Sequence, residues 1–200
     1  MPLLILVRHG ESQFNKKNLF TGWTDVLLSS KGKQEAKEAG KKIKKHGHDI
    51  HAAFSSKLKR SAHTLDIILD TMKLKKIPIL RSKALNERHY GILTKMHKKS
   101  AAEKYGQAQI DTWRYSHKIG PPKGESLKDV TDRVMPFFNT VAIKHLKEGK
   151  NVLISAHHHS IRSIISIIDR KARISDIPNG IPLVYELDDK LKPIKHYFLA

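Results

Sequence analysis

The chain has 200 residues, 39% of them hydrophobic, which is enough to bury the core of one domain and excludes a disordered chain. It contains no cysteine, which excludes disulfides, a thiolate metal site and a cysteine nucleophile. Lysine and arginine total 38 against 19 acidic residues, a formal net charge of +19. This charge attracts anions, whether nucleic acid, acidic lipid or phosphorylated metabolites, and does not choose among them.

The start of the chain and the distribution of charge narrow the choice of partners. The apolar start is too short for a signal core, and no later apolar run approaches the ~20 residues that span a bilayer. Nucleic-acid-binding proteins combine basic clusters with exposed aromatic residues, whereas aromatic residues make up 6% here and the lysines are spread along predicted helices. We therefore expect a cytoplasmic protein that binds neither nucleic acid nor membrane, and we leave a homodimer open.

Strand and helix patterns alternate along the chain. Short apolar runs predict strands at 3–8, 52–56, 77–80, 151–156 and 182–187. Apolar residues at helical spacing predict helices at 29–47, 59–73, 126–150 and 160–169, the third kinked or restarted at Pro136. Residues 81–125 mix loop and helix character. This alternation predicts one α/β domain over residues 1–200, a three-layer sandwich whose mostly parallel central sheet is flanked by helices.

Two of the predicted strands end in histidine, in LVRHGES (6–12) and ISAHHHS (154–160). Active sites of α/β proteins lie at such strand ends, which raises the question whether His9 and His157 meet. A neutral histidine can attack phosphorus, and a neighbouring arginine both lowers the imidazole pKa and binds phosphate oxygens. The segment RHG alone is weak evidence, because a capping or core histidine fits it as well.

Further motifs follow in order: NLFTGWTDVLLSSKG, SSKLKRSAHT, LNERHYG, WRYS, PPKGESL and PLVYELD. With these motifs the chain resembles the phosphoglycerate mutases that depend on 2,3-bisphosphoglycerate, within the histidine phosphatase superfamily. The resemblance runs from residue 3 to about residue 193, and FTGW, LNERHYG and PLVYELD are much more specific than RHG. It implies a phosphoglycerate mutase-like fold and the interconversion of 3-phosphoglycerate and 2-phosphoglycerate.

The resemblance also implies roles for the matched residues. His9 would be the phosphorylated nucleophile, His157 would steady the transferred phosphoryl group, and Glu87 would donate and accept the proton. The other implied positions are Arg8 and Arg60 at the phosphoryl oxygens, Asn15 as a neutral donor, Thr21 and Gly22 at the substrate carboxylate, and Tyr90, Lys98 and Arg114 at the substrate's anionic ends. The implied primer is 2,3-bisphosphoglycerate, the substrate is a small phosphorylated anion, and no metal is required because arginines neutralise the charge.

The chain departs from the resemblance in three places. Tyr115 stands where the mutases have an arginine, so substrate binding is expected to be weaker. Lys95 and His97 replace a glycine and an asparagine in a loop that should fold over the site.

The third departure is AHHHS, where the mutases have AHGNS. A metal site at His157 and His159 lacks a further convergent ligand. We expect instead that the backbone N–H groups at 158–160 begin a helix and help His158 and His159 bind an anionic substrate. A required positive φ at His158 would strain this turn.

Two other functions remain open at this level. A phosphatase of small phosphorylated metabolites would use the same fold and discharge phosphohistidine to water. A catalytically weakened polyanion-binding protein is suggested by the net charge and by Tyr115, but the presence of His9, Glu87 and His157 argues against it.

Overall fold

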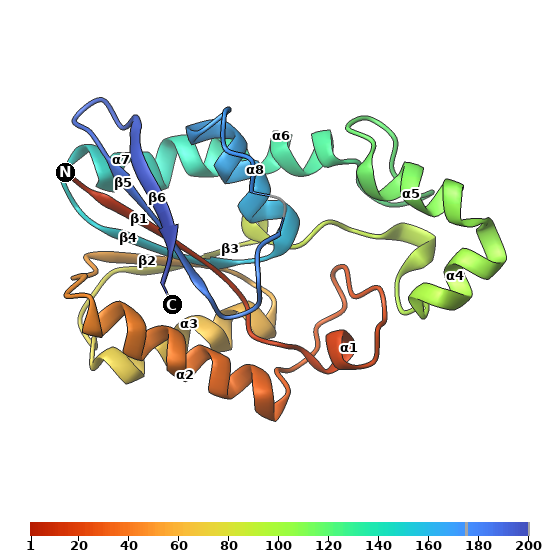
Figure 1. The fold of residues 1–200 in the computed structure, drawn as a ribbon, viewed down its shortest axis with the longest axis horizontal. Helices are drawn as coiled ribbons and strands as arrows, with labels where there is room; N and C mark the ends of the chain where they lie inside the picture. The colour runs from red at the N-terminus through yellow and green to blue at the C-terminus, as the bar shows by residue number, and fades with distance from the viewer. Residues whose placement is uncertain (175, 200) are drawn as a thin grey trace.

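A six-stranded sheet runs through the middle of the molecule in the computed structural model, which describes residues 1–174 and 176–199 (Figure 1). The strand order is β3-β2-β4-β1-β5-β6; β1 to β4 are parallel to their neighbours among these four, and β5 and β6 are antiparallel to theirs. The strands are β1 (Leu3–Arg8), β2 (Ala52–Ser56), β3 (Ile79–Ser82), β4 (Val152–Ala156), β5 (Pro182–Leu187) and β6 (Pro193–Phe198).

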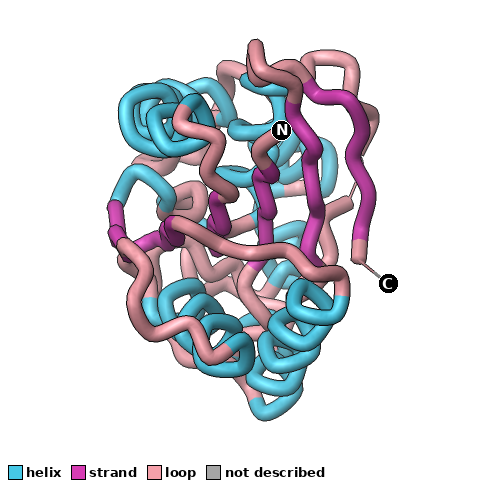
Figure 2. The backbone as a smooth tube through the Cα atoms, turned by 90° about the vertical axis from the view of Figure 1, so that its left-hand side faces the viewer, coloured by secondary structure: helices cyan, strands magenta, loops and turns pink. Residues whose placement is uncertain are grey.

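Helices cover both faces of this sheet (Figure 2). The helices α2 and α3 pack together on one face, and α6 and α8 pack together on the other. The α-helices are α1 (Gln13–Lys16), α2 (Ser30–Lys45), α3 (Lys59–Met72), α4 (Lys98–Tyr105), α5 (Gln107–Tyr115), α6 (Leu127–Phe137), α7 (Ile143–Lys147) and α8 (His158–Ile168). The predicted α/β sandwich with a mostly parallel central sheet is therefore confirmed.

The central strand β1 shows why both faces are covered. Its side chains alternate, so Leu4 and Leu6 join the core beneath α6 and α8, whereas Ile5 and Val7 join the core beneath α2 and α3. All four are fully buried. A strand buried on both faces reads as a continuous apolar run, which is why the sequence pattern located it.

The loop after β1 is held against the start of α2 by two glycines. A Cβ on Gly10 would lie 2.2 Å from the carbonyl oxygen of Gly32, and a Cβ on Gly32 would lie 2.1 Å from that of Glu11. Ser29 caps α2 by accepting a hydrogen bond from the N–H of Gly32. This close contact fixes the backbone that follows His9.

The segments around α1, α4 and α5 lie beyond the carboxyl ends of the parallel strands (Figure 1). They share a small core that includes Phe20, Leu93, Ala101 and Ile110. The N–H of Lys95 donates to the carbonyl oxygen of Phe20 at 2.7 Å, and the N–H of Phe20 donates to that of Met96 at 2.9 Å. The altered loop at 94–99 is therefore closed onto residues 18–20.

The sheet edges differ from the sequence prediction. Strand β3 begins at Ile79 and ends at Ser82, two residues later than predicted, because it pairs with β2 in the register Ala53↔Ile79. Pro78 has no N–H to donate and precedes the strand. Strand β6 was not predicted; it is an edge strand with mostly exposed side chains, so burial imposes no clear apolar pattern on it.

The long predicted helix at 126–150 is divided. Helix α6 passes through Pro136 and ends at Phe137, a π-helical turn η3 spans Phe138–Ala142, and α7 follows. Pro136 cannot donate its backbone hydrogen bond, which accounts for irregular helix at this place. Two 3₁₀ turns, η1 (Lys83–Leu85) and η2 (Gly91–Leu93), lie in the mixed segment. Within the described residues, no helix combines the length and the apolar character needed to cross a bilayer.

Lys95 has a φ of 70°, a left-handed conformation that favours glycine. We expect Lys95→Gly to raise the free energy of unfolding by about 0.5–1 kcal/mol, because the relief of left-handed strain exceeds the entropy cost of glycine. Urea denaturation measures the change. The control Lys99→Gly, at a helical position of α4, should have the opposite sign; a loss of stability in Lys95→Gly would contradict the prediction.

Candidate active site

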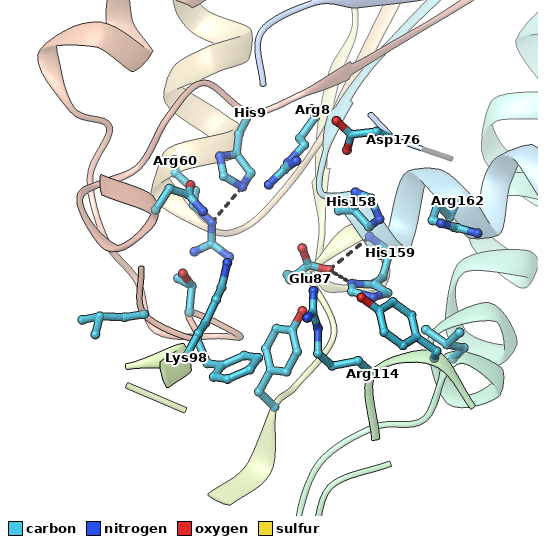
Figure 3. Close-up of a pocket in the computed structure, with 17 residues that line it drawn as sticks. Arg8, His9, Arg60, Glu87, Lys98, Arg114, His158, His159, Arg162 and Asp176 are labelled. Atoms are coloured by element: carbon cyan, nitrogen blue, oxygen red, sulfur yellow. Dashed lines mark hydrogen bonds and ion pairs between the residues drawn. The ribbon is translucent and has the colours of Figure 1, made fainter. Parts of the chain in front are cut away.

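A cavity of about 460 Å³ opens where β1 and β4 end (Figure 3). Its wall is strongly basic, with Glu87 and Asp176 as the acidic members. The lining residues are Arg8, His9, Asn15, Leu19, Phe20, Thr21, Arg60, Glu87, Tyr90, Lys98, Arg114, Tyr115, Leu127, His158, His159, Arg162 and Asp176.

His9 is held in one tautomer. Its Nδ1 lies 2.7 Å from the carbonyl oxygen of Gly10, so Nδ1 carries the proton and donates. The Nε2 atom therefore keeps its lone pair, which accepts a hydrogen bond from Nε of Arg60 at 3.3 Å. Burial, together with the charges of Arg60 and Arg8, holds the pKa of His9 well below its ordinary value. His9 is thus a neutral imidazole with its nucleophilic nitrogen beside two cations.

Arg60, at the start of α3, is 1% exposed and fixed by backbone oxygens. Its two terminal nitrogens donate to the carbonyl oxygens of Thr24 and Gly22 at 2.9 and 2.8 Å. Burial lowers the pKa of Arg60 to about 10, which leaves it charged at neutral pH. The FTGW motif therefore orients the guanidinium that contacts His9.

His157 meets His9, with ring centroids 4.9 Å apart. Its Nε2 lies 2.8 Å from the hydroxyl of Ser56, at the end of β2. Burial, then the charges of Arg60 and His9, lower the pKa of His157 well below its ordinary value. The two strand ends that carry histidine thus form one site.

Arg8 and Asn15 add donors around the same space. One terminal nitrogen of Arg8 donates to the carbonyl oxygen of Ile177 at 2.9 Å, while its buried Nε has no hydrogen-bond partner among the described residues. The Asn15 oxygen accepts from the N–H and hydroxyl of Ser12, at 3.0 and 2.7 Å, so its NH₂ group is the free donor. An unpartnered buried guanidinium nitrogen and a half-buried amide donor beside a neutral imidazole suit phosphate oxygens.

The Glu87 carboxylate lies in the cavity between Arg60 and His159 (Figure 3). Its Oε1 accepts hydrogen bonds from the N–H of Arg88 at 2.8 Å, and from the N–H and Nδ1 of His159, both at 3.2 Å. Burial by itself raises the pKa of Glu87, but the charge and hydrogen bonds of His159, the charge of His157 and the Arg88 N–H together lower it well below the usual range. Glu87 therefore rests as a carboxylate.

The backbone of Glu87 is anchored by two side chains that sequence reasoning did not assign. Its carbonyl oxygen accepts from Nε1 of Trp23 at 2.6 Å and from a terminal nitrogen of Arg133 at 2.9 Å. Arg133 also forms an ion pair with Glu125 at 2.7 Å. Trp23 belongs to the FTGW motif and could have been considered, whereas no local pattern marks Arg133 on α6.

Lys98, Arg114 and Tyr90 line the part of the cavity built by the segments beyond the sheet. Burial and the charge of Arg114 lower the pKa of Lys98, and burial together with Glu87 raises the pKa of Tyr90 to about 12. Fully buried Arg88 donates to the carbonyl oxygen of Trp113 at 2.9 Å, which secures the end of α5. Arg88 was not assigned from sequence, although it lies within LNERHYG.

All the predicted site residues line this cavity except His157 and Gly22. Gly22 acts through its carbonyl oxygen on Arg60, and its φ of 52° brings it against Tyr90, whose nitrogen would lie 3.2 Å from an added Cβ. Gly22 does not line the cavity and its carbonyl oxygen is already engaged by Arg60, so its contact with the substrate stays a prediction.

The departures from the resemblance have local explanations. His158 begins α8 without a positive φ, so the anticipated strain does not arise. The His159 N–H is bonded to Glu87, so it is not the free anion donor that we expected. His97 caps α4, its Nδ1 accepting from the N–H of Lys99 at 3.3 Å. Tyr115 lies at the cavity rim and is 66% exposed. Among the described residues, no group of three or more potential ligands is placed to hold a metal.

Comparison with solved structures gives the same fold throughout. The chain is similar to a mycobacterial glucosyl-3-phosphoglycerate phosphatase, with a TM-score of 0.83 and 18% identity, covering 100% of this chain and 98% of that one. For the alpha-ribazole phosphatase from Shigella flexneri the TM-score is 0.79 and the identity 21%, over 99% and 96% of the two chains. For phosphoglycerate mutase from Bacillus anthracis the values are 0.77 and 23%, over 92% and 88%.

These identities are low, so the similarity to each of these structures establishes the fold alone. A family model provides the stronger result, because the model of the histidine phosphatase superfamily (branch 1) matches residues 4–179. The match contains both strand-end histidines, Arg60 and Glu87. The chain therefore belongs to the histidine phosphatase superfamily (branch 1).

Proposed function

We propose that this protein interconverts 3-phosphoglycerate and 2-phosphoglycerate through phospho-His9, primed by 2,3-bisphosphoglycerate. The observation that carries the proposal is the unprotonated Nε2 of His9, which faces Arg60 in a basic cavity that also contains the Glu87 carboxylate. The motifs FTGW and LNERHYG, which distinguish the mutases from general phosphatases in the resemblance, build the supports of Arg60 and Glu87.

The residues suggest the following steps. The Nε2 lone pair of His9 attacks phosphorus, the phosphorus–oxygen bond breaks, and the leaving oxygen receives a proton through Glu87, which rests as a carboxylate and must first take that proton up. Arg8 and Arg60 offer charge to the phosphoryl oxygens during transfer. The acceptor hydroxyl then loses its proton to Glu87 as it attacks phospho-His9, which restores the neutral imidazole.

The cavity suits a molecule with anionic groups at two ends. Arg8 and Arg60 surround His9 at one end, and Lys98 and Arg114 provide cations near the segments beyond the sheet. When bound, 2,3-bisphosphoglycerate would supply the phosphoryl group that loads His9. The pairing of Lys95 and Met96 with Phe20 holds the loop at 94–99 beside this end of the cavity. A loop that excludes water there would favour return of the phosphoryl group to an intermediate over hydrolysis.

A phosphatase of small phosphorylated metabolites is the second candidate. Tyr115, 66% exposed at the cavity rim, stands where the mutases of the resemblance carry an arginine, so an anionic intermediate loses one contact. A weakly held intermediate leaves phospho-His9 to react with water. Two of the structurally similar proteins are phosphatases by name, which is compatible with this candidate at the level of fold.

The first experiment separates these functions. Purified protein is incubated with 3-phosphoglycerate, with and without 2,3-bisphosphoglycerate, and both 2-phosphoglycerate and free phosphate are measured. We expect 2-phosphoglycerate that depends on the bisphosphate, and complete loss of it in His9→Ala because the nucleophile is gone. The control His63→Ala changes an exposed histidine of α3 outside the cavity and should keep the activity.

Other outcomes of this experiment contradict the proposal. Release of phosphate alone would support the phosphatase. Absence of turnover and of phospho-His9 in the unmodified protein would support a weakened polyanion-binding protein.

Tyr115 at the cavity rim allows a test of substrate binding. We expect Tyr115→Arg to lower the KM for 3-phosphoglycerate about tenfold and to raise the ratio of 2-phosphoglycerate to free phosphate, because a charge-assisted hydrogen bond contributes about 1.5–3 kcal/mol. Steady-state kinetics measure both effects. The control Tyr115→Phe should leave the product ratio unchanged, and an unchanged KM in Tyr115→Arg would contradict a substrate contact at the rim.

A further inference from the structure

His159 is in direct contact with the proposed acid–base residue. Its Nδ1 lies 3.2 Å from Oε1 of Glu87, and the two side chains are 15% and 10% exposed. His159 comes from the first turn of α8, whereas Glu87 comes from the segment after η1, so the pair joins two distant parts of the chain. Figure 3 shows the two side chains facing each other at the cavity.

The contact raises a question of proton supply. Oε1 of Glu87 accepts three N–H donors, an arrangement that favours the ionised carboxylate. A carboxylate has no proton to give to a leaving oxygen. A neighbouring group must therefore deliver one when the phosphorus–oxygen bond breaks.

Titratable and charged groups face this pair from several elements. They are Arg8 at the end of β1, His9 just after it, Arg60 on α3, Arg88 and Tyr90 beside Glu87, Lys98 on α4, Arg114 on α5, Arg133 on α6, His157 and His158 at the start of α8, Arg162 further along α8, and Asp176 after it. Arginine keeps its proton at neutral pH. Burial and the charge of Glu87 raise the pKa of Tyr90 to about 12, and burial and His159 lower that of His158 to about 4, so neither readily exchanges a proton near neutrality.

The buried histidines do not replace His159 either. The Nδ1 proton of His9 is engaged with Gly10; Nε2 of His157 is engaged with Ser56, and its buried Nδ1 has no hydrogen-bond partner among the described residues, so neither ring is bonded to Glu87. Among the described residues, His159 is the histidine whose ring nitrogen contacts the Glu87 carboxylate. The ring of His159 also lines the cavity, where the reacting groups would meet.

We propose that His159 is a positioning residue for Glu87 that also holds its proton between the two half-reactions. The inference rests on the proposed phosphoryl transfer. As His9 attacks, the proton at Nδ1 of imidazolium His159 moves to Oε1 of the Glu87 carboxylate, and the protonated carboxyl passes a proton to the leaving oxygen. In the second half-reaction the acceptor hydroxyl gives its proton to Glu87, which returns it to Nδ1, so no net proton is gained or lost.

The experiment uses leaving groups that differ in their need for a proton. Single-turnover formation of phospho-His9 is measured with 2,3-bisphosphoglycerate, whose alkoxide must be protonated, and with p-nitrophenyl phosphate, whose phenolate leaves without a proton. We expect His159→Asn, which keeps a neutral side-chain donor, to slow the first reaction by about tenfold or more and to change the second by less than about threefold. It should also remove the alkaline limb from the pH profile of the first reaction.

Two further variants make the result specific. Glu87→Gln should also slow phospho-His9 formation from 2,3-bisphosphoglycerate more than from p-nitrophenyl phosphate, and by a larger factor than His159→Asn does. His158→Asn alters the neighbouring ring, which has no hydrogen bond to Glu87, and should keep the alkaline limb at its original pH whatever its rate. Equal slowing of both donors in His159→Asn, or loss of the limb in His158→Asn, would overturn the inference.

Failure of the underlying function gives a different result. Phospho-His9 that never forms in the unmodified protein, or Glu87→Gln that shows no difference between the donors, would contradict the proposed acid–base role itself. If Glu87→Gln slows the reaction of 2,3-bisphosphoglycerate more than that of p-nitrophenyl phosphate and His159→Asn does not, the acid–base role of Glu87 stands. Only the part assigned to His159 is then removed.

Discussion

The hydrogen bond from Nδ1 of His9 to the carbonyl oxygen of Gly10 is the constraint on which the site depends. It leaves the lone pair on Nε2, the atom that Arg60 contacts. The bond ties the ring to the backbone just after β1, and the tight contact of Gly10 with Gly32 holds this backbone against the start of α2. Packing at the start of one helix therefore helps to select the tautomer of His9, while burial and the charges of Arg60 and Arg8 keep the ring neutral.

The other side chains of the site are also held mainly by hydrogen bonds to backbone atoms, and less by side-chain pairs. Arg60 is oriented by the carbonyl oxygens of Gly22 and Thr24, and Glu87 is anchored through its own carbonyl by Trp23 and Arg133. The FTGW segment thus supports the cation and the carboxylate together. A site held this way resists rearrangement, because each support is itself packed or bonded elsewhere.

The differences from the mutases that the chain resembles with most effect on chemistry lie at the rim of the cavity and beside Glu87. His97 and His158 replace other residues and are accommodated by a helix cap and a helix start. Tyr115 removes a cation from the rim, and His159 introduces an imidazole against Glu87. The fold therefore accommodates these substitutions, and Tyr115 and His159 are the ones that alter the chemical groups available in the cavity.

The apolar runs and motifs of the chain were enough to predict the α/β class, the buried strands and the candidate site residues. Continuous burial leaves a continuous apolar pattern, and the ordered motifs located His9, Arg60, Glu87 and His157. The edge strands, the use of the Gly22 oxygen and the contact of His159 with Glu87 became evident only in the folded chain. These depend on groups far apart in the chain that meet through packing, and neither an exposed edge nor a single carbonyl acceptor leaves a periodic signal in the residues that form it.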